Sequence, residues 1–312
     1  MEDKSRRWIA VTAIAPIAWG STYFVTRQLL PPDVPLWGGL LRALPAGLLV
    51  LLLSRRLPAG HWWWRSLVLG TLNVGGFFVL VYVAGQRLPS SVASTLMSTS
   101  AAAMMLLAWL LMRQRPRLAA ALGAVVGIAG VVLMLGVGGE PVDPIGVVAS
   151  IAAMFASSIG FVLTSRWGAD VPALAMTSWQ LIGGSLVLLP FAVVLEGGPP
   201  VLTPVSAVGF AYVAIVGTAV AYVAWFTGLR RLSPAAVGMI GLLNPLTGVL
   251  LGVAVAGEVF GLAQAVGFVL VVAGIALGLL PPRSRRHERQ SADRMRQSGR
   301  ASALAVRDEM RA

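Results

Sequence analysis

Three kinds of residue are scarce in this 312-residue chain, and each scarcity excludes a class of protein. Cysteine is absent, which excludes disulfides and thiolate metal sites. The two histidines, His61 and His287, have no acid or nucleophile at a useful spacing within an apolar run, which argues against an intramembrane enzyme. Charged residues make up 12% of the chain, against about 25% in soluble domains. Composition therefore excludes an ordinary soluble domain, and no metal or other cofactor is expected.

Apolar residues fill the chain instead, at 57% of the total and with a mean hydropathy of +0.82. They occur in runs of roughly 20 residues, the length that crosses the hydrocarbon core as a helix. The sequence therefore predicts an all-α integral membrane protein with about ten transmembrane helices in a lipid bilayer. The expected spans are Trp8–Leu30, Pro35–Leu53, Trp62–Val83, Pro89–Met112, Leu118–Val137, Ile145–Thr164, Pro172–Leu195, Val205–Thr227, Pro234–Ala256 and Val259–Leu280.

The positive charges behind the net charge of +12 are concentrated in alternate connections between the apolar runs. If the N-terminus is cytoplasmic, the arginine-rich connections all fall inside, and Arg87 is the single cation of the outer connections. This positive-inside pattern predicts a multi-pass protein of the cell membrane with both termini in the cytoplasm, and no nucleic-acid partner. The basic tail, residues 281–312, is expected to be disordered, either solvated or lying on anionic lipid head groups. The acidic residues assigned to the outer side are Asp33, Glu140, Asp143, Glu196 and Glu258.

The chain repeats itself after about 140 residues. "AGQRLPSSVAS" is followed later by "GLRRLSPAAVG", and the glycines of two closing segments pair at a spacing of 144 residues, as Gly123 does with Gly267. "LLRALPAG" matches "SWQLIGGS", which sets Arg42 against Gln180. Because each half has five spans, the second half enters the membrane from the opposite side, as in the inverted repeats of secondary transporters. The expected divisions are an N-terminus (1–7), a first repeat (8–138), a second repeat (139–280) and the tail.

The order of motifs across the two repeats resembles a known family. "WGSTYFV" at Trp19–Val25, "LR" at Leu41–Arg42, "LNPLTGVLLG" at Leu243–Gly252 followed by Glu258, and both glycine-rich closing helices are similar to the EamA branch of the drug/metabolite transporter superfamily. The resemblance covers nearly all of residues 8–280. It implies a ten-helix carrier with a central cavity, usually an exporter of amino acids or other small metabolites. The closing glycines serve either as scaffold or as the contact of a homodimer.

The polar residues inside the spans indicate what such a cavity could bind. No carboxylate lies mid-span, which argues against an exporter that exchanges cationic drugs for protons at a membrane acid. Arg42 lies about 12 Å from the outer end of its helix, where a charge costs roughly 2.5 kcal/mol or more. It either binds an anionic substrate group or forms an internal strut. The cavity candidates are Trp19, Ser21, Tyr23, Arg42, Asn73, Ser98, Gln180, Tyr222, Trp225 and Asn244.

These features together predict a secondary transporter that works by alternating access. The expected substrate is a small neutral, zwitterionic or anionic metabolite, such as an amino acid, moved outward. Two alternatives stay open: a flippase for a lipid or a lipid-linked sugar, with the same architecture, and, less favoured, an intramembrane enzyme.

Overall fold

The computed structural model describes residues 2–100, 103, 110, 118–136, 142–167, 171–229, 231, 240–241 and 243–279, and all its elements in these ranges are helices. Six helical stretches are long and apolar enough to cross a membrane, and three shorter apolar helices accompany them in the described part of the chain. This arrangement confirms the all-α membrane fold of about ten helices. The side chain of Ser98 and the tail, residues 281–312, lie outside the described residues.

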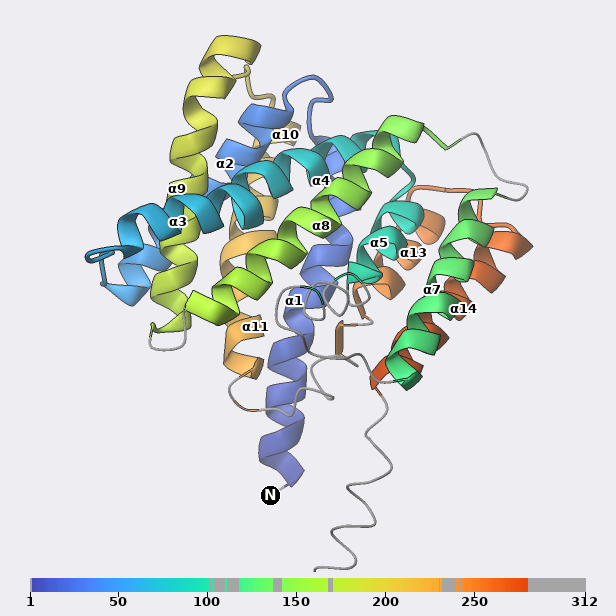
Figure 1. The fold of residues 1–312 in the computed structure, drawn as a ribbon. Coiled ribbons are helices and arrows are strands. Elements are labelled where there is room, and N and C mark those ends of the chain that lie inside the picture. The colour runs from blue at the N-terminus through green and yellow to red at the C-terminus, as the bar shows by residue number, and fades with distance from the viewer. Residues whose placement is uncertain are drawn as a thin grey trace, which may run out of the picture.

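The helices follow the apolar runs of the sequence in order (Figure 1). Two runs are divided by a π-helical turn into one long broken helix each: α3–η1–α4 and α10–η3–α11. The elements of the first half are α1 (Glu2–Leu29), α2 (Pro35–Ser54), α3 (Trp62–Gly70), η1 (Thr71–Gly75), α4 (Gly76–Arg87), α5 (Ser90–Ser98) and α7 (Leu118–Gly136). Those of the second half are α8 (Pro144–Trp167), α9 (Ala173–Phe191), η2 (Ala192–Glu196), α10 (Pro204–Ala214), η3 (Ile215–Val220), α11 (Ala221–Leu229), α13 (Leu243–Ala254) and α14 (Leu262–Leu279).

The π turns η1 and η3 occupy matching places in the two halves. Thr71, the first residue of η1, and Ile215, the first residue of η3, are 144 residues apart, the same spacing that separates Gly123 from Gly267. A π turn widens the helix and shifts its hydrogen bonds, so a side chain from a neighbouring helix can reach backbone or hydroxyl acceptors there. Single π turns inside α-helices are frequent at functional sites, which directs attention to η1 and η3.

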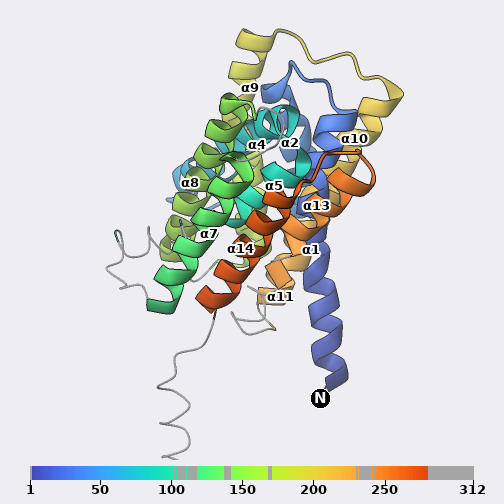
Figure 2. The same cartoon turned by 90° about the vertical axis from the view of Figure 1, so that its right-hand side faces the viewer.

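Equivalent helices of the two halves pack against one another. α7 lies along α14 at one edge of the bundle, as both views show (Figure 1, Figure 2), and α2 packs against α9 in the same way. A Cβ on Gly130 would overlap the backbone of Gly267, and one on Gly274 would overlap that of Gly123. Small residues allow this close approach between helices in lipid. Gly130 and Gly274 therefore serve as scaffold inside one chain.

We call the side on which α1 begins the N-terminal face, and the opposite side the distal face. Helix ends on the distal face are joined by hydrogen bonds between the two halves. Glu196, at the end of η2, accepts bonds from the backbone N–H groups of Leu36 and Trp37 at 2.7 and 2.9 Å. Glu258, beyond α13, accepts from Ser90 N at 2.5 Å and from Ser91 Oγ at 2.8 Å. Each carboxylate thus caps the open N-terminus of a helix in the first half.

Candidate functional site

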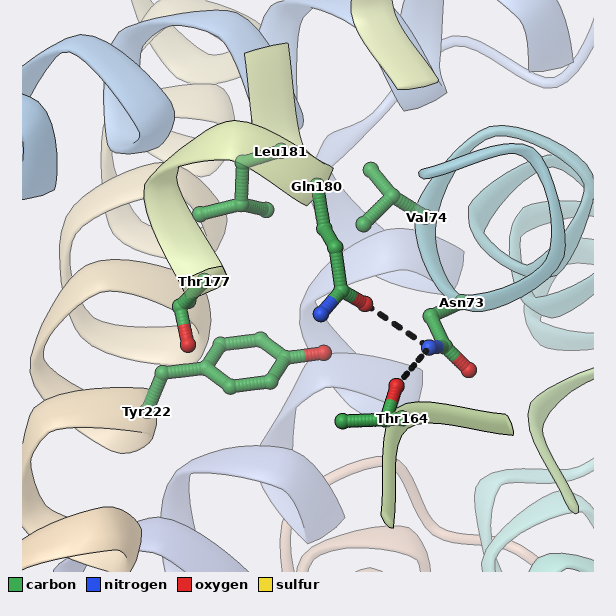
Figure 3. A pocket seen from close by; sticks show the side chains of 7 residues that line it. All are labelled: Asn73, Val74, Thr164, Thr177, Gln180, Leu181 and Tyr222. Atoms are coloured by element: carbon green, nitrogen blue, oxygen red, sulfur yellow. Dashed lines mark hydrogen bonds between the residues drawn. The ribbon is translucent and has the colours of Figure 1, made fainter. Parts of the chain in front are cut away.

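A polar pocket lies between helices of both halves, toward the N-terminal face. The empty space at this site, open solvent included, is about 330 Å³. Gln180 lies seven residues from the start of α9, or about 10 Å in from that face. Figure 3 shows the side chains converging from α8, α9, α11 and η1. The lining residues are Asn73, Val74, Thr164, Thr177, Gln180, Leu181 and Tyr222.

An amide pair forms the polar centre of this pocket. The Asn73 amide nitrogen, in η1, donates to the Gln180 side-chain oxygen at 2.8 Å and to the Thr164 hydroxyl at 3.3 Å. Tyr222 points its hydroxyl into the same space, between Gln180 and Thr164 (Figure 3). The Asn73 side-chain oxygen is buried without a partner among the described residues. Amides and hydroxyls both donate and accept hydrogen bonds, so this centre suits a solute with neutral polar groups.

The pocket can form because helices approach very closely beside it. A Cβ on Gly184 of α9 would overlap the backbone at Gly70 and Gly75, and a Cβ on Gly160 of α8 would overlap the Asn73 amide. Glycine at these positions lets α9 and α8 bring their polar side chains against η1. The same local logic explains the placement of Asn73, whose amide reaches across only because no side chain intervenes at Gly160.

Arg42 lies outside the pocket lining, on α2, and its side chain is only 8% exposed. Its Nε donates to the Thr218 hydroxyl at 2.8 Å, and its Nη2 donates to the Gly217 carbonyl at 3.2 Å, both in η3. The guanidinium carbon lies 4.2 Å from the centroid of the Phe78 ring, a cation–π distance. The ion pair found among the described residues, Arg87 with Asp143, is elsewhere. Within the described part of the chain Arg42 therefore has only neutral partners.

The aromatic candidates divide between two places. Trp19 of α1 packs against Tyr222 and Trp225 of α11, with ring centroids 5.8 and 5.2 Å apart. Tyr222 is the member of this group that also lines the pocket. Tyr23, four residues after Trp19, packs instead into an apolar cluster with α4 residues such as Val81 and Ala84. The two residues are one helical turn apart on α1, and their rings pack against different neighbours.

The remaining candidates are placed apart from the pocket lining. Ser21 bonds to the Tyr212 hydroxyl at 2.7 Å, and Asn244 lies at the start of α13 with a buried side-chain oxygen that has no partner among the described residues. Sequence reasoning missed Thr164, Thr177 and Thr218. Threonines in membrane helices commonly bond to their own helix, as Thr218 also does at the Val213 carbonyl, so sequence alone held no signal that would have singled them out.

The comparisons with known proteins agree with this architecture. The family model described as the EamA-like transporter family matches residues 6–136 and 144–280. The chain belongs to that family. It is 40% identical to protein PecM of Dickeya dadantii over 84% of this chain and 89% of that one. It is 28% identical to an uncharacterized inner membrane transporter, YedA, of Escherichia coli over 84% and 87% of the two chains.

Two further likenesses extend over most of the chain. A probable amino-acid metabolite efflux pump of Salmonella typhimurium is 25% identical over 92% of this chain and 99% of its own. A solved crystal structure of another protein aligns with a TM-score of 0.61 at 20% identity, over 87% of this chain and 96% of that one. The latter supports the fold alone. The family assignment makes this EamA protein a multi-pass membrane transporter.

Proposed function

We propose that this EamA protein exports a small metabolite, an amino acid or a related neutral, zwitterionic or anionic solute, by alternating access. With the N-terminal face in the cytoplasm, as the arginine distribution favours, the pocket lies on the cytoplasmic side and the distal face is the outer side. The amide and hydroxyl lining offers hydrogen bonds to polar groups of the solute, and Tyr222, next to Trp19, offers an aromatic surface.

The observation that carries this proposal is the contrast between the two faces. The pocket lies toward the N-terminal face, while Glu196 and Glu258 tie helix ends of the two halves together on the distal face. A carrier that loads from the cytoplasm is expected to have this form, with its polar pocket on the cytoplasmic side and its helix ends joined on the other. A relative with the name of a probable amino-acid metabolite efflux pump supports the same class of substrate.

A counterflow screen on the purified protein in proteoliposomes tests the proposal. Vesicles loaded with an unlabelled metabolite mixture should accumulate labelled members of the true substrate class, and Gln180→Ala should reduce that accumulation about tenfold. The control variant Gly127→Ala faces open space and should transport normally. Fluorescent-lipid scrambling, measured in the same vesicles, tests the alternative function. Movement of lipid without movement of any metabolite would show that the protein is a flippase and not an exporter of metabolites.

A further inference from the structure

The same contact between a helix and a π turn occurs twice in this protein. Arg42 of α2 bonds to Gly217 and Thr218 in η3, and Gln180 of α9 bonds to Asn73 in η1. Arg42 and Gln180 are matched by the repeat in the sequence, and Asn73 and Gly217 are 144 residues apart, the spacing of the paired glycines. Each half therefore extends one side chain from its second helix to the π turn of the other half.

The two contacts differ in environment and in charge. The Gln180 contact lines the pocket near the N-terminal face, whereas Arg42 lies seven residues from the start of α2, about 10 Å in from the distal face. An apolar cluster joins the two contacts, because Val74 and Leu181, which line the pocket, pack with Phe78, which stacks against Arg42. In an inverted repeat the alternate conformation exchanges the roles of the halves, so the Arg42 contact should then become the exposed one.

The surroundings of Arg42 leave its charge without an acidic partner among the described residues. A buried guanidinium without a carboxylate is costly, and among the described residues it is held only by a hydroxyl, a carbonyl and a ring. A carboxylate matches the guanidinium fork with two parallel hydrogen bonds. Bonds between charged groups are roughly twice as strong as neutral ones, so a substrate carboxylate can compete successfully with Thr218 and Gly217.

We propose that the substrate carries a carboxylate, and that Arg42 binds this group when the carrier opens to the distal face. This inference rests on the proposed function and narrows its substrate class. The amide pair at Asn73 and Gln180 receives neutral polar groups of the solute on the cytoplasmic side. When the carboxylate binds, Arg42 exchanges its hydrogen bonds to η3 for bonds to the substrate. The contact between α2 and η3 is therefore broken only when substrate is present.

The test compares each acid with its own primary amide. Proteoliposomes are assayed by counterflow with a panel of N-acetylated amino acids and the corresponding amides, which differ only in the carboxylate. The wild-type protein should prefer the acids about tenfold. Arg42→Gln, which copies the equivalent residue of the second repeat, should lower acid transport about tenfold and change amide transport less than twofold. Gln180→Ala serves as the matched comparison and should lower both by the same factor.

Two further variants keep the test decisive if Arg42→Gln does not fold. Arg42→Lys keeps the charge without the fork and should retain part of the acid preference. Thr218→Val removes the competing acceptor and should raise the apparent affinity for acids about threefold. An acid-to-amide ratio that is the same in wild type and every Arg42 variant would make Arg42 a strut and overturn the inference, while leaving the exporter intact. A wild-type protein that moves no member of this panel and no member of the metabolite mixture in the counterflow screen would contradict the proposed function itself.

Discussion

Arg42 and Gln180 both contact a π turn of the other half, but Arg42 does so with a charged guanidinium and Gln180 with a neutral amide. On the pocket side, Gln180 meets Asn73, and Gly184 lies against Gly75 with no side chain between the helices. On the distal side, Arg42 meets η3, and the equivalents of that glycine pair, Ala46 and Ala219, pack in one buried apolar cluster.

The difference shows where a duplicated fold can specialise. The π turns η1 and η3 are repeated at matching positions of the two halves. Side chains at the matched positions are free to differ, since each faces its own surroundings in one conformation. The pocket side carries a neutral amide, and the distal side carries a charge held by neutral groups. Exchange between the two conformations would then give the substrate two distinct partners.

The largest loss of stability is expected from adding a side chain where two helix backbones are in direct contact. Gly184→Val should abolish the close packing of α9 on η1 and α3, because even a Cβ overlaps the backbone at Gly70 and Gly75. Overpacking of this kind costs about 1–3 kcal/mol or more. The purified variant should show a strongly lowered melting temperature or no folded peak by size-exclusion chromatography. Gly127→Ala, where nothing lies within 4 Å, is the control. A variant as stable as wild type would mean that α9 does not approach this closely.

A smaller effect should follow from removing the pocket-side donor. Asn73→Ala leaves the Gln180 side-chain oxygen without its 2.8 Å donor, at a cost of about 1–3 kcal/mol for a buried polar group. We expect transport to fall about tenfold with a modest loss of thermal stability. Thr177→Val, at another position in the lining, should have a lesser effect. Equal loss in both variants would show that the amide pair has no special role in the pocket.

Removing the charge of either carboxylate cap should make the distal face easier to open. Glu258→Gln weakens the cap on α5 by about 1 kcal/mol, and Glu196→Gln does the same for α2. Opening of the distal face should become easier. Because the chain has no cysteine, a single Leu30→Cys at that face reports opening directly. The labelling rate by an impermeant thiol reagent should rise several-fold in either cap variant. An unchanged labelling rate would show that these caps do not hold the distal face closed.

The sequence predicted the helices well and the site only in part. Apolar runs predicted the spans, because length and hydropathy are imposed by the bilayer itself. The repeat matched Arg42 with Gln180, and the structure brings each to a π turn. Asn73, Gln180 and Tyr222 line the pocket, while the other candidates whose side chains are described do not.

The rest depended on facts that one sequence does not carry. A π turn leaves no distinctive residue pattern, so η1 and η3 were not expected. Trp19 and Tyr23 are one helical turn apart, and neighbouring helices are so close that this one turn changes the contact from α11 to α4. Thr164 and Thr218 were indistinguishable from threonines that satisfy their own helix until the partner helices were in place.

The smallest effect should come from the exposed pair on the distal face. Arg87 donates to Asp143 at 2.9 Å, and this bond, with the backbone N–H of Ile145, lowers the pKa of the Asp143 carboxyl below its ordinary 3.8. A carboxyl whose pKa is lower in the folded than in the unfolded protein stabilises the fold at pH values above the unfolded pKa. That stability is lost as the pH falls through the folded pKa. Arg87→Gln should therefore raise the pKa of Asp143 while leaving thermal stability at pH 7 nearly unchanged, because exposed pairs contribute little. Titration of Asp143 by carbon-13 NMR, with melting measured from pH 3 to pH 7, would check both parts. A marked loss of stability at pH 7 would show that this pair contributes more to the fold than an exposed pair ordinarily does.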